Sequence, residues 1–297
     1  MSSWQARLLR LAQLGFRAFN PTALDVAAER RQAAWAEQLF RLPRGTTCTA
    51  AAAGGVPAEW ITPPSVTSDR VLVYIHGGGF YAGTLAGARP VAAQLAAAAH
   101  ERALTLDYRL APEHPFPAAL EDAQRGYAWL LAEGHPPDEI VLVGDSAGGT
   151  LVLALLVALR EAGQPLPGGA VAFSPATDLT LTGPTWTSNA GRDRLLPQSK
   201  IRAAVAHYLG GADPQHPLAS PLYADLHGLP PLLLFVGSEE HLRSDVTRLA
   251  ERAQAAGGAV TLVVADGMQH GWHLLADFLP EGRQALTRAA AFCARPG

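Results

Sequence analysis

The stretch IVLVGDSAGG at residues 140–149 decides the fold that this sequence predicts. Its first four residues form a short apolar, β-branched run typical of a buried parallel strand, and the apolar run at residues 150–159 predicts a helix. Ser146 then lies at a sharp strand-to-helix turn, where Gly144 and Gly148 leave it room. This Gly-x-Ser-x-Gly pattern is typical of a nucleophile elbow, which exposes the serine hydroxyl. A serine N-cap beside glycines that allow close packing would explain the same residues without catalysis.

Composition limits the classes of protein to which this chain can belong. The 297 residues are 48% hydrophobic, enough for one large α/β domain or two small ones, and only 16% are charged. The net charge of −3 predicts no basic surface for nucleic acid. The two cysteines, Cys48 and Cys293, fit neither a metal site nor a disulfide framework. We therefore expect a cytoplasmic protein without a cysteine-bound metal.

The N-terminal region predicts no stable membrane insertion. No apolar run reaches the length of a membrane span, and arginines interrupt the leucines between residues 7 and 17, so no signal-peptide core forms. Trp4, Leu8 and Leu11 fall at helical spacing and predict an amphipathic helix. Such a helix could lie on a membrane surface, but packing against the body of the protein is the commoner use of an apolar stripe.

Hydrophobic patterning along the chain alternates between strand and helix. This alternation predicts an α/β fold in which helices flank both faces of a mostly parallel central sheet. Strands are expected at residues 46–52, 56–61, 71–75, 103–107, 140–143, 170–174, 231–236 and 260–264, and helices at 87–99, 118–133, 150–159, 242–256 and 278–293.

Two regions depart from this alternation. Residues 1–44 predict two helices separated at Asn20-Pro21, because proline ends one helix readily and begins another. Residues 179–229 are rich in proline and contain one helical pattern at 199–209. We expect both regions to form a helical cap over a catalytic domain of residues 45–297.

A glycine run follows the strand expected at residues 71–75. His76-Gly77-Gly78-Gly79 leaves backbone N–H groups uncovered, so that they can approach a substrate oxygen. Together with the amide of the residue after the nucleophile, such a loop forms an oxyanion hole. The predicted donors are Gly78, Gly79 and Ala147, with His76 supporting the loop. A flexible turn would explain one or two of the glycines, but explains three poorly.

A serine nucleophile needs a base and an acid. Of the ten histidines, His270 is the candidate base, because it follows the last expected strand and completes the order serine, acid, histidine. The loop at residues 237–245 offers Glu239, Glu240 and Asp245 as the acid. The 30 residues from 240 to 270 accommodate one helix and one strand, but the spacing suits all three carboxylates.

A further stretch, DYRLAPEHPFPA at residues 107–118, identifies a family. Its three prolines predict an extended path. Together with HGGGF at 76–80 and GDSAGG at 144–149, it resembles the esterases of the bacterial hormone-sensitive-lipase family. The three motifs occur in the family's order, and the resemblance extends from about residue 56 to the C-terminus.

The resemblance implies an α/β-hydrolase fold that hydrolyses carboxylic esters without a cofactor, with Ser146 as nucleophile and His270 as base. Where the family usually has Asp-Pro-Leu, this chain has Glu240-His241-Leu242. The resemblance therefore implies Glu240 as the acid, and leaves Glu239 and Asp245 as alternatives. Arg109 and Glu113, in the stretch at 107–118, are expected to be structural.

The resemblance also suggests a class of substrate. Residues 55–60 and the Glu-Glu-His-Leu loop are most similar to monoterpene ε-lactone hydrolases and acetyl esterase-like enzymes, which implies short- to medium-chain esters or lactones. Trp186, Tyr208 and Trp272 are candidates for the pocket wall, and each is equally compatible with the core. The expected partner is a small-molecule ester, and a homodimer is one possible assembly. The alternatives are a ligand-binding protein on the same fold, a lipase or an amidase.

Overall fold

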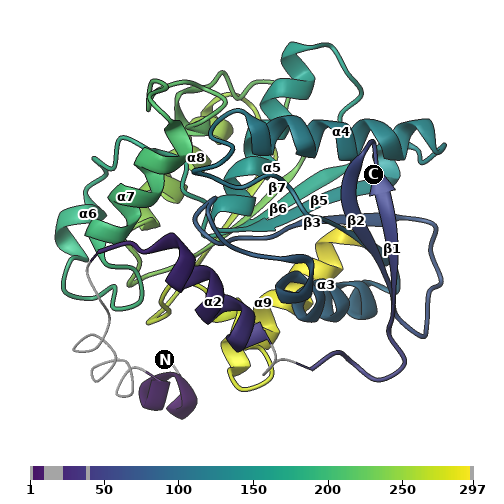
Figure 1. Ribbon diagram of the computed structural model, residues 1–297, viewed down its shortest axis with the longest axis horizontal. Helices are drawn as coiled ribbons and strands as arrows, with labels where there is room; N and C mark the ends of the chain where they lie inside the picture. The colour runs from purple at the N-terminus through teal and green to yellow at the C-terminus, as the bar shows by residue number, and fades with distance from the viewer. Residues whose placement is uncertain (1–2, 10–22, 38–40, 295–297) are drawn as a thin grey trace.

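The computed structural model describes residues 3–9, 23–37 and 41–294. Figure 1 shows a central twisted sheet between helices, so the α/β fold predicted from the sequence is confirmed. The described residues form an eight-stranded sheet in the order β1-β2-β4-β3-β5-β6-β7-β8. Its strands are β1 (Thr47–Ala53), β2 (Val56–Thr62), β3 (Val71–Ile75), β4 (Arg102–Leu106), β5 (Ile140–Asp145), β6 (Gly169–Phe173), β7 (Leu232–Gly237) and β8 (Val260–Ala265).

Strand direction divides the sheet into two parts. Strand β2 pairs antiparallel with both β1 and β4, whereas all pairs from β4 to β8 are parallel. Gly54 and Gly55 connect β1 to β2 in a hairpin, with φ values of +60° and +83°. Glycine has no Cβ and adopts these left-handed angles without strain. The parallel strands carry their carboxyl ends to one edge, where the candidate site lies.

Helices cover both faces of the sheet. Helices α3 (Leu85–Ala99) and α9 (Pro280–Cys293) lie on one face, and α4 (Ala118–Ala132), α5 (Ala147–Glu161) and α8 (Arg243–Ala255) lie on the other (Figure 1). Alternate residues of β5 point to opposite faces. Accordingly, Leu142 belongs to the apolar cluster under α5, whereas Val141 and Val143 belong to the cluster under α3 and α9.

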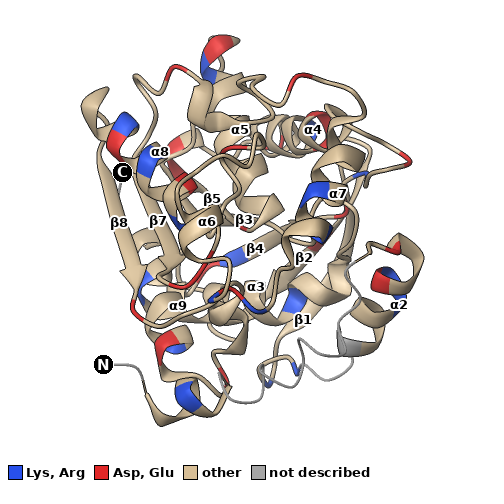
Figure 2. Ribbon diagram, turned by 90° about the vertical axis from the view of Figure 1, so that its left-hand side faces the viewer, with Lys and Arg blue, Asp and Glu red and all other residues tan. Residues whose placement is uncertain are grey.

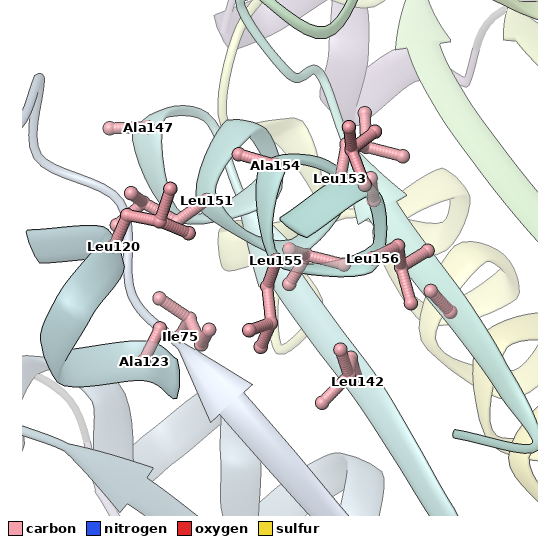
Figure 3. Packing of buried hydrophobic residues seen from close by; sticks show 14 of the residues in the cluster. Ile75, Leu120, Ala123, Leu142, Ala147, Leu151, Leu153, Ala154, Leu155 and Leu156 are labelled. Carbon is pink, nitrogen blue, oxygen red and sulfur yellow. The ribbon is translucent and has the colours of Figure 1, made fainter. Parts of the chain in front are cut away.

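Helix α5 is the most deeply buried helix that contacts the site. Every residue from 147 to 159 is buried, as expected for a helix that is apolar all round. Figure 3 shows Leu151 and Leu155 directed toward the sheet residues Ile75 and Leu142. Burying one such leucine contributes about 1.5–3 kcal/mol to the free energy of folding. This packing fixes the position of the residue just before the helix.

That residue, Ser146, connects β5 to α5 in a backbone conformation rare for a side-chain-bearing residue, with φ +51° and ψ −120°. The helix begins at Ala147, earlier than the 150–159 run predicted, so Gly148 lies in its first turn. A Cβ on Gly148 would lie 2.0 Å from the carbonyl oxygen of Ile75. Only glycine therefore lets the helix approach the end of β3 this closely.

Further helices lie near the carboxyl edge of the sheet. Between β6 and β7 are α6 (Thr185–Ser188), α7 (Gln198–Leu209) and the 3₁₀ turn η2 (Pro221–Tyr223), and α7 confirms the helix expected at 199–209. Helix α2 (Val26–Glu37) comes from the N-terminal region, and residues 4–9 are also helical. The predicted break at Asn20-Pro21 lies outside the described residues. Short 3₁₀ turns η1 (Pro137–Glu139) and η3 (Trp272–Leu275) complete the described elements.

Charged residues are distributed over helices and loops. In the view of Figure 2, acidic and basic residues are interspersed, as expected from the small net charge. Cys48 and Cys293 are both free thiols.

In the described part of the chain, no helix is both long enough and apolar enough to cross a bilayer.

The close approach of α5 to β3 predicts the effect of a single methyl group. We expect Gly148→Ala to lower the free energy of unfolding by about 2 kcal/mol or more, because the new Cβ overlaps the Ile75 carbonyl. Gly191→Ala is the matched control, since a Cβ there meets no atom within 4 Å, and its effect should stay within about 0.5 kcal/mol. Urea unfolding followed by circular dichroism measures both. Equal midpoints for the two variants would contradict the packing described.

Candidate active site

Four loops at the carboxyl edge of the sheet bring the predicted site residues together. The glycine run follows β3, Ser146 follows β5, Glu240 follows β7 and His270 follows β8. Because these strands are parallel and adjacent or nearly so, their carboxyl ends meet at one edge. Gly78 and His270, which are 192 positions apart in sequence (270 − 78), thus line one cavity.

Ser146, His270 and Glu240 form a continuous hydrogen-bonded chain. The imidazole Nε2 of His270 lies 2.9 Å from the Ser146 hydroxyl oxygen, and its Nδ1 lies 2.8 Å from Oε2 of Glu240. A carboxylate on Nδ1 fixes the proton on that nitrogen, which leaves Nε2 free to accept the serine proton. The three side chains therefore have the geometry of a nucleophile, a base and an orienting acid.

The Glu240 carboxylate is itself held in place. Its side chain is fully buried, and its second oxygen, Oε1, accepts hydrogen bonds from the Ser174 hydroxyl at 2.7 Å and the Gly237 N–H at 2.5 Å. Ser174 follows β6 with a φ of +48°, which directs its hydroxyl to this carboxylate. Ser174 was not predicted from the sequence, because an isolated serine after a strand has no distinguishing pattern.

The other two candidate acids lie elsewhere. Glu239 is 3.6 Å from Arg192 and partly exposed. Asp245 is buried in α8, where its carboxylate faces Ser244. Adjacent residues in a loop point in different directions, so spacing along the chain did not distinguish these three carboxylates. Of the three, only Glu240 is hydrogen-bonded to His270.

The environment of His270 favours its charged form. Burial lowers the pKa of the imidazole, but the hydrogen bond to Glu240 and the charge of that carboxylate raise it, as do the charges of Asp193 and Asp145. The net result is a His270 pKa above its ordinary value near 6.5. A base that gains a proton in the reaction is stabilised by these same carboxylates.

Two other histidines, His241 after β7 and His273 after β8, have different surroundings. His241 is buried and stacks on Trp186, with ring centroids 5.3 Å apart. His273 is buried and stacks on Phe173 at 4.3 Å, and burial lowers its pKa to about 4. His273 is therefore neutral at physiological pH and adds no positive charge beside His270.

Asp145 connects the glycine run to the elbow. Its Oδ1 accepts hydrogen bonds from the Gly77 N–H at 2.9 Å and from the Tyr74 hydroxyl at 2.6 Å. Burial raises the pKa of Tyr74, as does the Asp145 charge, so the phenol remains a donor. A role for Asp145 was not predicted from the sequence. A charged residue ending an otherwise apolar strand was the available signal.

The glycine run has the conformation expected of a donor loop. Gly78 and Gly79 have φ values of +115° and +61°, and both line the cavity together with Ala147. A Cβ on Gly78 would lie 2.1 Å from the Ala82 carbonyl oxygen. In the described residues, the N–H groups of Gly78, Gly79 and Ala147 donate no hydrogen bond to another backbone group. They are therefore available to an oxygen placed in the cavity.

The residues expected to support this loop make structural contacts. His76 is buried, stacks on Tyr108 with ring centroids 4.4 Å apart, and its carbonyl accepts a hydrogen bond from the Tyr108 hydroxyl at 2.8 Å. Arg109 binds Asp122 at 2.9 Å. Glu113 forms an ion pair with Arg30 of α2 at 2.7 Å.

Arg30 contacts the loop after β3 as well. Its Nε donates to the Tyr81 carbonyl at 2.7 Å, and its guanidinium also donates to the Ala111 carbonyl at 3.0 Å. Arg30 therefore fastens α2 to the loop that carries Gly78 and Gly79.

Ser146 lines a cavity of about 430 Å³. Its wall is mostly apolar and comes from α2, the loop after β3, and α7 with the residues just before it. Lys200 of α7 and Glu29 of α2 form an ion pair at 2.5 Å in this wall. The apolar part of the wall is formed by Ala33, Phe80, Ala176, Leu195, Leu196, Pro197, Ile201, Ala204, Val205, Leu242 and Leu274.

The three predicted pocket aromatics are not in this wall, which corrects the sequence-based expectation. Trp186 is buried against His241, and Tyr208 is buried with its ring 3.7 Å from that of Phe80, measured between centroids. Trp272 packs beneath the His270 loop in the cluster under α3 and α9. Tyr208 supports the wall from behind through Phe80. Residue type made each aromatic a candidate for the pocket wall or for the core, but it did not distinguish the two.

Within the described residues, no group of three or more histidine, cysteine, aspartate or glutamate side chains is arranged to hold a metal ion.

Comparisons with known proteins find relatives over most of the chain. A family model described as the alpha/beta hydrolase fold matches residues 72–274. An acetyl-hydrolase of Streptomyces hygroscopicus is 44% identical over 267 residues, which cover 90% of this chain and 87% of that protein. An esterase of Acinetobacter venetianus is 37% identical over 239 residues, which cover 80% of this chain and 78% of that protein.

Solved structures are similar over the whole chain. The crystal structure of an esterase from the bacterial hormone-sensitive lipase family is 44% identical, has a TM-score of 0.94, and covers 100% of this chain and 99% of its own. A hormone-sensitive lipase from a metagenome library has the same TM-score of 0.94 at 34% identity, with 99% and 98% covered. The family predicted from the three motifs is therefore confirmed: this chain is a carboxylic ester hydrolase of the bacterial hormone-sensitive-lipase family of α/β-hydrolases.

Proposed function

We propose that the protein is a serine esterase that hydrolyses short- to medium-chain carboxylic esters through Ser146, His270 and Glu240. The observation that carries the proposal is the hydrogen-bonded chain from the Ser146 hydroxyl through His270 to Glu240. Ser146, at one end of this chain, lines a mostly apolar cavity. Uncovered amides at Gly78, Gly79 and Ala147 in the same cavity supply the second requirement, a place for a negative oxygen.

The first half of the reaction forms an acyl-enzyme. The Ser146 oxygen attacks the ester carbonyl carbon as Nε2 of His270 takes the hydroxyl proton. The carbonyl oxygen becomes an oxyanion and accepts hydrogen bonds from the loop and helix amides. The bond to the alcohol oxygen then breaks, and the alcohol leaves with the proton from His270.

The second half frees the acid. Water loses a proton to Nε2 of His270 and attacks the acyl carbon, and collapse of the second oxyanion breaks the bond to Ser146, whose oxygen recovers the proton. Glu240 stabilises the imidazolium that forms in each half. The raised pKa of His270 is consistent with that stabilisation.

The cavity supports a limit on substrate size. A volume of about 430 Å³ with a mostly apolar wall suits an ester of short or medium chain length, and a ring-closed ester, a lactone, presents the same carbonyl to Ser146. The proposed substrate class thus follows from the volume and the apolar wall of the cavity, and it agrees with the name of the acetyl-hydrolase relative.

We assign the cap to residues 1–44 and 179–229 on the same observation. Glu29 and Ala33 of α2 and Lys200 and Ile201 of α7 all line the cavity that contains Ser146. Two segments far apart in sequence thus close one side of the site, and their ion pair between Glu29 and Lys200 joins them.

The chain-length preference is the first test of this function. With p-nitrophenyl esters from acetate to palmitate, we expect kcat/KM to be highest for short or medium chains and to fall for long ones. Ser146→Ala should remove activity on every ester, by a factor on the order of 10⁶ in kcat, as in the subtilisin series. Initial rates of p-nitrophenolate release measure both effects.

The p-nitrophenyl ester assay, together with rates on a triglyceride and on anilides, separates the alternative functions. No turnover of any ester by a folded wild-type protein would favour a ligand-binding role on this fold. A rate that rises sharply above the solubility limit of a triglyceride would favour a lipase, and faster cleavage of anilides than of matched esters would favour an amidase. Each of these results contradicts the proposed esterase function.

Two neighbouring glutamates allow a matched test of the acid. We expect Glu240→Gln to lower kcat by on the order of 10³- to 10⁴-fold, because the amide neither balances the imidazolium charge nor fixes the His270 tautomer. Glu239→Gln, which changes a carboxylate on the adjacent residue without a bond to His270, should leave kcat within about threefold of wild type.

The pH dependence of kcat/KM provides a second test of the interaction between Glu240 and His270. Only neutral His270 accepts the Ser146 proton, so kcat/KM should rise with pH through a midpoint above 6.5. Since Glu240 raises the His270 pKa, Glu240→Gln should move this midpoint to lower pH, while Glu239→Gln leaves it in place. A midpoint that moves with Glu239 instead would contradict the assignment of the acid.

A further inference from the structure

The loop that carries Glu240 is held from outside by the segment between β6 and β7. Residues 185–193, which include α6 and the turns after it, contact this acid loop, residues 237–241, at several points. Asn189 and Asp193 make the central contacts, and both are buried, with 3% and 4% of their surfaces exposed. Buried polar side chains are costly unless they are paired, so their partners matter.

Asn189 binds the acid loop on both sides of residue 239. Its side-chain nitrogen donates to the Ser238 carbonyl at 3.0 Å and to the Glu240 carbonyl at 2.8 Å. Both partners are carbonyl oxygens, which only accept, so the amide must present its NH₂ group to them. One side chain therefore fixes the backbone immediately before and at Glu240.

Asp193 binds the backbone of His241, the residue after Glu240. Its Oδ2 accepts from the His241 N–H at 3.0 Å, while its Oδ1 accepts from the Leu196 N–H at 3.3 Å. The His241 carbonyl accepts from the Thr185 hydroxyl at 2.5 Å. The peptide groups on both sides of His241 are thus tied to the segment between β6 and β7.

The same segment contacts the loop of the base. The Gln269 side-chain nitrogen donates to the Arg192 carbonyl at 3.3 Å, next to His270 in sequence. Trp186 stacks on His241 with the two rings within 7° of parallel. Neither Asn189 nor Asp193 is part of the wall of the substrate cavity. Asn189 therefore affects catalysis through the loops it binds, whereas Asp193 also acts on His270 through its negative charge.

We propose that Asn189 and Asp193 are positioning residues that hold the Glu240 carboxylate within hydrogen-bonding distance of His270. The segment between β6 and β7 then supports the acid of the triad as well as forming part of the cavity wall. This inference rests on the proposed function, because it assigns the two residues a role toward Glu240 as the acid. A displacement of the reacting groups by about 1 Å can cost on the order of 100-fold in rate, which makes the support of this loop consequential.

Truncation of the amide tests the proposal. We expect Asn189→Ala to lower kcat by about 10- to 100-fold and to leave KM within about threefold, because the substrate does not touch the side chain. Gln215→Ala, which truncates an exposed amide in the same segment, is the control and should leave both constants unchanged. A raised KM with an unchanged kcat would overturn the proposal.

A double-mutant cycle separates positioning of Glu240 from a general structural role. If Asn189 acts through Glu240, adding Asn189→Ala to Glu240→Gln should reduce kcat by no more than about twofold further. If the two losses multiply, Asn189 acts independently of the acid and the proposal is wrong. If Glu240→Gln alone has no effect, the proposed acid fails instead, so the two failures are distinguishable.

Asp193 gives an independent test that does not require the Asn189 variant to fold. Asp193→Ala removes the acceptor for the His241 N–H and should lower kcat by about tenfold or more, whereas Asp193→Asn keeps an oxygen acceptor and should restore most of it. Rates are compared on the alkaline plateau, where His270 is neutral in every variant. Asp213→Ala, at an exposed aspartate of the same segment, is the control.

Rates of the Asp193 variants have to be compared on the alkaline plateau because of the charges that face His270. Glu240, Asp193 and Asp145 each raise its pKa, and the neutral His273 lies nearby, so removing the Asp193 charge also moves the acidic limb. On the plateau this shift no longer contributes to kcat. Equal plateau values for Asp193→Ala and wild type would overturn the role of Asp193.

Discussion

The close approach of α5 to the ends of β3 and β5 is the constraint on which the site depends. Gly148 lets the first turn of the helix touch the Ile75 carbonyl, and the apolar face of α5 holds that contact against the sheet. Ser146 is thereby kept at a φ of +51°, a conformation that an isolated peptide would rarely adopt. The stability of the core thus maintains the local strain that exposes the nucleophile.

Three buried carboxylates around this turn have different tasks, set by what each one binds. Asp145 accepts from Gly77 and Tyr74 and so ties the donor loop to the elbow. Glu240 contacts the imidazole, and Asp193 holds the loop on which Glu240 lies. Their negative charges also sum at His270, whose protonated form the reaction needs only transiently. The electrostatics of the site and its mechanical support therefore come from the same groups.

Patterns that are local in sequence predicted much of this arrangement. The elbow, the glycine run and the strand–helix alternation led to the family and the sheet, because small residues and hydrophobic periods are direct consequences of backbone geometry. Contacts between distant loops were not predictable in this way. Nothing in the sequence near Asn189 indicates its hydrogen bonds to Ser238 and Glu240. Trp186 is of a residue type common in pocket walls, but it lies in the core. Depth and direction of a side chain depend on how the segments pack.

The most direct test of the central claim is covalent labelling of the nucleophile. After treatment with a diethyl p-nitrophenyl phosphate ester, peptide mapping by mass spectrometry should find one diethylphosphoryl group, on Ser146. The rate of labelling should fall as the pH is lowered through the pKa of His270, because the protonated imidazole cannot accept the serine proton. Labelling of a different residue, or labelling of Ser146 at a rate independent of His270 protonation, would contradict the account.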